Sequence, residues 1–82
     1  MTLNAIPVGR RCRILGIQGE ESAVRRAKEL GLVPGVLCTV IRKAPFSGPI
    51  ELATSLARIG IRVSAELQLD VELLPVHVSE AA

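Results

Sequence analysis

Apolar and polar residues alternate in five short stretches of the chain, and a period of two residues is typical of half-buried β-strands. The stretches cover residues 9–17, 36–43, 50–54, 57–62 and 69–73. In the fourth stretch, Ile59 and Ile61 alternate with Arg58 and Arg62. This pattern predicts that both isoleucines face the interior, from a strand that we expect to lie in the middle of a sheet.

A different period separates the first two of these stretches. Val24, Ala27 and Leu30 recur at three-residue steps, which predicts a helix from Ser22 to Leu30 with these three side chains facing inward. We expect Ser22 to cap the start of the helix and Gly31 to end it in the left-handed conformation. A helix of about two turns is marginal alone, so it must pack against the rest of the protein.

Turn-forming residues lie between the periodic stretches. Pro34 and Gly35 form one turn, residues 44–49 form a loop with two prolines and a glycine, and residues 64–67 are expected to form one helical turn. Short strands with one inserted helix predict a mainly β fold, a small and partly open barrel of about five strands with the helix over one opening. We expect a single domain over residues 1–82, with residues 75–82 as a fraying tail.

Phe46 is the only aromatic residue among 82, although 49% of the residues are hydrophobic. The core must therefore be aliphatic, and an aromatic groove for polyproline peptides cannot exist. The same composition argues against binding of single-stranded nucleic acid, whose bases stack on aromatic side chains. For Phe46 itself, two interpretations remain open: a lid on the core, or an exposed anchor for a partner.

Charge is distributed unevenly along the chain. Residues 1–43 carry eight basic and three acidic side chains, whereas residues 44–82 carry two basic and five acidic ones. Such a bias fits attraction of an acidic partner and equally fits a solvated barrel surface. Duplex nucleic acid could contact Arg10, Arg11 and Arg13, but a net charge of only +2 makes it a weak candidate, and we expect no nucleic acid partner.

The chain shows neither a membrane segment nor a targeting signal. No uncharged apolar run approaches the roughly 18 residues of a membrane span. The first seven residues lack the basic start and long apolar stretch of a secretory signal. We therefore expect a cytoplasmic protein that does not insert into a membrane.

Residues suited to catalysis or metal binding are few. His77 is the only histidine, and no Ser-His-Asp or Cys-His arrangement can be built around it, so we expect no enzymatic activity. His77 and Glu80 could hold an incidental divalent metal ion, but a stable iron site needs more converging ligands, and we expect no cofactor. Cys12 and Cys38 lack a CxxC spacing and are typical of buried apolar residues; they could form a disulfide only by facing each other on paired strands.

Two motifs in fixed order resemble the FeoA family, small cytoplasmic proteins of the bacterial ferrous iron transport system. The first is RRAKELGLVPG at residues 25–35, a helix ending in Glu-Leu-Gly-Leu before a Pro-Gly turn. The second is RKAPFSGPI at residues 42–50, a strand ending in Arg before an Ala-Pro-x-x-Gly-Pro loop. Ala27 stands where the family pattern favours Leu, and Ser47 where the loop usually has Gly; neither change removes a charged group.

The resemblance implies an SH3-like barrel and a role in supporting the membrane-embedded ferrous iron transporter. It implies contact with the cytoplasmic part of that transporter, which carries a GTP-binding domain. Charge and exposure then suggest Arg25, Arg26, Arg42 and Phe46 as the partner-binding residues, because all four fall on the family's motifs. The alternative is a regulatory or sensory domain that binds a divalent metal or nucleic acid. Nothing in the sequence indicates the oligomeric state.

Overall fold

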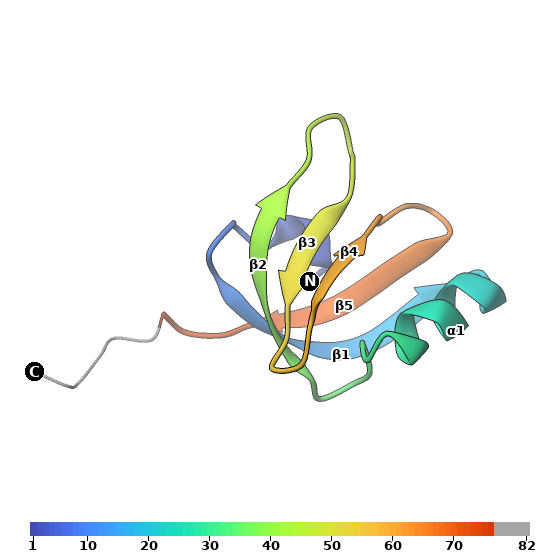
Figure 1. Cartoon of the computed structure of the whole chain (residues 1–82), viewed down its shortest axis with the longest axis horizontal. Coiled ribbons are helices and arrows are strands. Elements are labelled where there is room, and N and C mark those ends of the chain that lie inside the picture. Colours follow the sequence, from blue (N-terminus) through green and yellow to red (C-terminus); the bar gives the residue numbers. More distant parts are fainter. Residues whose placement is uncertain (77–82) are drawn as a thin grey trace, which may run out of the picture.

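The computed structural model describes residues 1–76, which form one curled antiparallel sheet with a helix at its side (Figure 1). The elements are η1 (Leu3–Ala5), β1 (Arg11–Gly19), α1 (Glu21–Glu29), β2 (Leu37–Lys43), β3 (Ile50–Ala53), β4 (Arg58–Ile61) and β5 (Leu67–Leu73). The order of strands in the sheet is β4-β3-β2-β1-β5. The mainly β fold expected from the alternation is confirmed.

The core lies on the concave side of the curled sheet and is entirely aliphatic apart from two cysteines. The period of two places alternate residues there, as expected for a sheet with one buried face. No polar or charged side chain is buried within residues 1–76. The strands contribute these core residues: Cys12, Ile14, Cys38, Val40, Ile50, Leu52, Ile59, Ile61, Leu67, Leu69 and Val71.

The two cysteines are register partners on β1 and β2, and their Sγ atoms lie 3.5 Å apart. Both are buried thiols without a disulfide, so the expectation of apolar core residues holds. Hydrogen bonding to Cys12, together with burial, raises the pKa of Cys38, so this thiol stays protonated at neutral pH. The geometric condition for a disulfide, two cysteines facing each other on paired strands, is also met.

The start of helix α1 differs from the expectation. Ser22 lies inside the helix, and the capping residue is Glu20, whose carboxylate accepts the backbone N–H groups of Ser22 and Ala23. The Ser22 hydroxyl donates to the same carboxylate at 2.6 Å instead of capping the backbone itself. The end of the helix is as expected, since Gly31 adopts a positive φ of 98°.

Leu30 was expected to face inward, but it is 48% exposed. The helix ends at Glu29, so Leu30 lies at the cap and leaves the inward row that Ala27 continues. Ala27 is buried, and Val24 packs partly buried against the core.

Residues 64–67 form a tight turn between β4 and β5 and not the helical turn that was expected. Ser64 and Leu67 exchange two backbone hydrogen bonds, with the Ser64 N–H donating at 3.0 Å and the Leu67 N–H at 3.1 Å. This exchange closes a loop of two residues, 65 and 66, and strand β5 begins directly after it at Leu67.

The position of β4 also differs from the expectation, because it is an edge strand of the sheet and not a middle one. Its inward face is nevertheless as expected, with Ile59 and Ile61 buried. A strand pattern reports which side chains face the core, whereas the number of neighbouring strands depends on the topology of the whole chain.

The other edge strand, β5, is covered by the amino-terminal segment. Thr2 forms an isolated bridge with Asp70, and the Val71 N–H donates to the Met1 carbonyl at 2.7 Å. The terminal ammonium group lies 3.1 Å from the Asp70 carboxylate. Leu3 and Ile6 of the same segment are fully buried in the core, although no sequence period marked them. The sheet is thus closed at β5 by its own chain.

Candidate functional site

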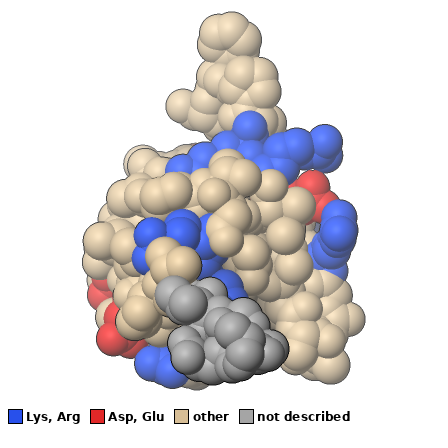
Figure 2. Space-filling view, turned by 90° about the vertical axis from the view of Figure 1, so that its left-hand side faces the viewer, with Lys and Arg blue, Asp and Glu red and all other residues tan. Residues whose placement is uncertain are grey.

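The hairpin tip, residues 44–49 between β2 and β3, carries Phe46. The tip is held by two backbone hydrogen bonds, from the Ala44 N–H to the Pro49 carbonyl at 3.0 Å and from the Gly48 N–H to the Pro45 carbonyl at 3.1 Å. Phe46 is 100% exposed, which decides between the two interpretations of this residue: it is no lid on the core. Figure 2 shows the tip projecting above the body of the molecule, with basic side chains below it.

The backbone of the hairpin tip is strained. Phe46 and Ser47 have φ values of 58° and 59°, in the left-handed region of backbone conformations that residues other than glycine rarely adopt. Such strain persists only where the surrounding structure fixes it, and it is enriched at functional sites. Here the two prolines and the two backbone hydrogen bonds fix the loop so that its aromatic side chain stays in solvent.

Arg42 lies at the base of the hairpin tip, near the end of β2. Its guanidinium is 3.3 Å from Glu51 on β3, and Arg58 on β4 is 3.5 Å from the other oxygen of the same carboxylate. One acid therefore balances two arginines, which leaves a basic surface beside Phe46. A hollow of about 370 Å³ lies between these side chains and includes Pro49 and Gly60 among its lining residues.

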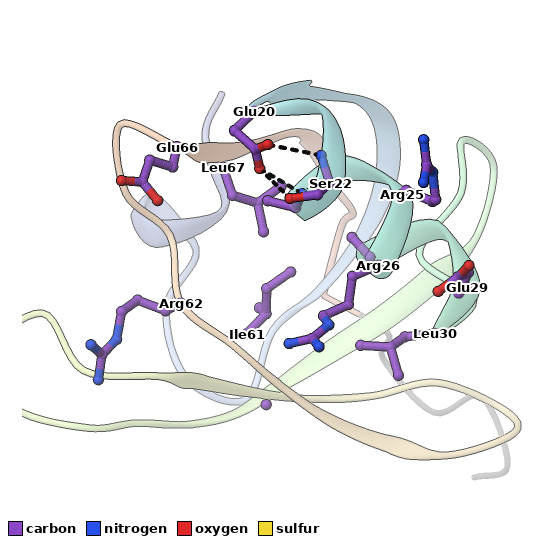
Figure 3. Close-up of a pocket in the computed structure, with 13 residues that line it drawn as sticks. Glu20, Ser22, Arg25, Arg26, Glu29, Leu30, Ile61, Arg62, Glu66 and Leu67 are labelled. Atoms are coloured by element: carbon purple, nitrogen blue, oxygen red, sulfur yellow. Dashed lines mark hydrogen bonds between the residues drawn. The ribbon is translucent and has the colours of Figure 1, made fainter.

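Arg25 and Arg26 lie on helix α1. Arg25 is 3.9 Å from Glu21, one turn earlier on the exposed face of the helix. Arg26 forms no ion pair with any residue in the range 1–76. It lines a groove of about 740 Å³ between α1, β4 and the start of β5. Figure 3 shows its guanidinium reaching from the helix toward Ile61.

Charged side chains surround the apolar floor of this groove, which we call the α1–β4 groove. Ala27, Leu30, Ile61 and Leu67 form the floor. Around it lie Arg25, Arg26, Arg62, Glu20, Glu29 and Glu66. Glu20 is committed to the helix start, where hydrogen bonds from the Ser22 hydroxyl and from two backbone N–H groups lower the pKa of its carboxyl (Figure 3).

The four residues predicted to bind a partner fall into two groups. Arg42 and Phe46 lie together on the β2–β3 hairpin, and Arg25 and Arg26 lie together on α1, at different ends of the molecule in Figure 1. Gly60 of β4 lines both the hollow beside Arg42 and the α1–β4 groove.

Sequence reasoning predicted the strand between these two groups but missed its position at the edge of the sheet. The alternation of Arg58, Gly60 and Arg62 was visible in the sequence, but it marked only the solvent face of a strand. That the strand also forms an edge follows from the topology.

Of the residues suggested for other chemistry, some lie within the described part of the chain and some outside it. Within residues 1–76, no three His, Cys, Asp or Glu side chains are grouped to hold a metal ion. His77 and Glu80 lie outside the described residues. Of the arginines considered for duplex nucleic acid, Arg13 is 3.1 Å from Glu72, and Arg10 donates to the Leu74 carbonyl at 2.8 Å. No helix in the described part of the chain has the length and apolar character needed to cross a bilayer.

A small curled sheet of five antiparallel strands with one short helix defines a class of protein, the small SH3-like β domains. Residues 1–72 match the FeoA domain family. The chain therefore belongs to the FeoA domain family, as its two motifs indicated.

Two solved structures are similar over nearly the whole chain. The solution NMR structure of the FeoA protein from Chlorobium tepidum has a TM-score of 0.81 and 28% sequence identity, with 98% of this chain and 76% of that chain covered. The NMR structure of a FeoA-like protein from Clostridium acetobutylicum has a TM-score of 0.76 and 28% identity, with 100% and 95% covered. No curated protein matches the chain.

Family membership places the chain in ferrous iron transport as a small accessory domain. The FeoA family is not a known enzyme family, and its association with ferrous iron transport systems points to a transporter as partner.

Proposed function

We propose that this chain acts in the cytoplasm, where it binds the GTP-binding region of the ferrous iron transporter and adjusts its activity. In this proposal the chain binds no cofactor and performs no catalysis itself. Its family role in ferrous iron transport supports the pathway. The single observation that supports binding most directly is Phe46, a fully exposed aromatic side chain on a strained loop.

The exposed phenyl ring is suited to insertion into an apolar pocket of a partner. Burying a phenylalanine side chain is favourable by roughly 1.5–3 kcal/mol. Because the loop conformation is already fixed by two backbone hydrogen bonds, little ordering of the loop has to accompany binding. Arg42 and Arg58 beside the loop add positive charge at the rim of such a contact.

The arginines of α1 have a different role in this proposal. Arg25 and Arg26 are exposed and stand apart from the hairpin tip, so they steer an acidic surface toward the protein and do not anchor it. Rim charges of this kind mainly change the association rate and its dependence on salt.

Binding kinetics with the purified cytoplasmic region of the transporter, with and without guanine nucleotide, test the proposal. Phe46→Ala should speed dissociation and weaken affinity by about 30-fold, the equivalent of roughly 2 kcal/mol. Arg26→Ala should slow association and reduce its salt dependence. Leu56→Ala is the matched control, because Leu56 is an equally solvent-facing apolar residue in the β3–β4 turn, at the other end of β3. Equal kinetics for all three variants and the parent chain would contradict the proposal.

A further inference from the structure

The two edges of the sheet are treated differently by the fold. The outer edge of β5 is covered by Met1 and Thr2, as described above. At the outer edge of β4, no residue in the range 1–76 forms a backbone bridge. An uncovered edge strand presents unpaired N–H and C=O groups that an added strand can use.

The hydrogen-bond register shows which backbone groups of β4 point outward. The Thr54 N–H donates to the Ala57 carbonyl at 2.9 Å and closes the β3–β4 hairpin. Hydrogen-bonded pairs alternate along an antiparallel ladder, so Ile59 and Ile61 bond to β3 through their pairs with Leu52 and Ile50. Arg58 and Gly60 therefore direct their N–H and C=O groups away from β3, toward the uncovered side.

The side chains along this edge are arranged with room for a neighbour. A Cβ added to Gly60 would meet no atom within 4 Å, so the outward face of the sheet is open over this glycine, and Gly60 also lines the α1–β4 groove beside the edge. Arg58 begins β4 and Arg62 directly follows it, and both are exposed. Alternation along the strand places both on the side opposite Ile59 and Ile61, and Arg62 also borders the α1–β4 groove. On the other face, Ile61 joins Leu30 and Leu67 at the apolar floor of the α1–β4 groove, with the Arg26 side chain reaching toward it from the helix (Figure 3).

We propose that β4 binds a short extended peptide by antiparallel strand addition, and that the peptide carries acidic residues at positions p and p+4 with aliphatic residues at p+1 and p+3. With p+2 opposite Gly60, the two acidic residues lie opposite Arg62 and Arg58 and on the same face as these arginines. The aliphatic residues then point to the face of Ile59 and Ile61, into the groove under α1. The main chain supplies affinity and the side chains supply selectivity.

Charge decides between this peptide and a second copy of the chain. In an antiparallel β4–β4 pair centred on Gly60, Arg58 of each copy would lie opposite Arg62 of the other copy, which makes two Arg–Arg pairs. Like charges directly opposite each other destabilise an antiparallel pair. The same two positions favour a strand with carboxylates there. This inference depends on the geometry of β4 and holds whether or not the transporter is the partner.

A labelled synthetic peptide with the sequence Gly-Glu-Val-Thr-Val-Glu-Gly, capped at both ends, tests the proposal by fluorescence anisotropy and amide hydrogen exchange. We expect binding that slows exchange of the Gly60 amide at least tenfold and leaves the Ile59 amide, already bonded to β3, unchanged. The double variant Arg58→Glu/Arg62→Glu should lose at least tenfold in affinity and should gain affinity for the same peptide with Lys in place of Glu. The control Arg11→Glu/Lys28→Glu has the same net charge, leaves β4 intact and should bind the acidic peptide within threefold of the parent.

Three results would overturn the inference. The first is equal affinity of the parent and the charge-reversed β4 variant for the acidic peptide. The second is binding that leaves exchange of the Gly60 amide unchanged. The third is a concentration-dependent dimer in which the Gly60 amide is protected without any peptide, which would assign the edge to a second copy. Circular dichroism of each variant verifies that the fold is intact, and the Lys peptide gives a gain of binding that an unfolded variant could not show.

Discussion

Truncating Ile61 on β4 and Leu52 on β3 should produce two different losses of stability from the same chemical change. Each substitution by alanine removes three carbon atoms from the core, which costs about 2.4 kcal/mol at roughly 0.8 kcal/mol per carbon. Leu52 is 0% exposed and enclosed by neighbouring strands, so a cavity remains and raises the cost to about 3–5 kcal/mol. Ile61 is 6% exposed and borders the α1–β4 groove, where Leu30 and Arg26 can move into the space, so its cost stays near 2–3 kcal/mol.

Urea unfolding followed by far-ultraviolet circular dichroism measures both values, since the chain has no Trp or Tyr for fluorescence. A chain of this length has a total unfolding free energy of about 4–12 kcal/mol, so the loss for Leu52→Ala is a large share of the total and is readily measured. A loss for Ile61→Ala equal to or larger than that for Leu52→Ala would show that the groove is closed in solution. A loss below about 1 kcal/mol for Ile61→Ala would show that β4 has the opposite face inward.

Three further changes have defined outcomes. Gly19→Ala should lower the unfolding free energy by more than about 1 kcal/mol in urea titrations. The reason is that Gly19 has a φ of 146° and that an added Cβ would collide with the Glu66 carbonyl. An unchanged urea midpoint of unfolding would contradict this prediction. Glu20→Ala should lower the melting temperature at pH 7, and the difference from the parent should shrink as the pH falls. Because the pKa of Glu20 is lowered in the folded state, its carboxylate stabilises the fold above the unfolded-state pKa, and this stabilisation disappears when the carboxylate is protonated. A difference that grows in acid would refute it. Cys12 and Cys38 should resist a thiol reagent in the native protein and react in urea, since both are buried; immediate reaction of either would show an open barrel.

Elements with a clear local period could be predicted from the sequence. Strand faces such as that of Ile59 and Ile61 follow from alternation alone, and the helix end follows from Gly31. The opposition of Cys12 and Cys38 was stated only as a condition, because strand register depends on pairing and not on either strand by itself.

Features fixed by distant contacts could not be predicted. Leu3 and Ile6 are fully buried because the amino-terminal segment lies along β5, a contact that no nearby residue signals. The helix cap is a local feature that was also missed: Glu20 replaces Ser22 as the cap because its longer side chain reaches two N–H groups and the Ser22 hydroxyl together. The edge position of β4, on which the proposed peptide site depends, likewise follows only from the complete strand order.

The described residues present two surfaces with different chemistry. The hairpin tip offers one rigid aromatic side chain beside basic groups, which suits insertion into a pocket. The β4 edge offers backbone groups flanked by Arg58 and Arg62, which suits an extended acidic segment. A single partner could engage both, because Gly60 borders the groove on one side and the hollow beside Arg42 on the other.

Uptake of labelled ferrous iron tests the central claim, a supporting role at the transporter through the exposed hairpin tip, most directly. Cells that lack this chain but retain the transporter are complemented with the parent chain, with Phe46→Ala or with the control Leu56→Ala, and the initial uptake rate is measured at equal protein levels. The account predicts that the parent and Leu56→Ala restore uptake, whereas Phe46→Ala restores only a small part of it. Full restoration by Phe46→Ala, or uptake that does not depend on the chain at all, would contradict the account.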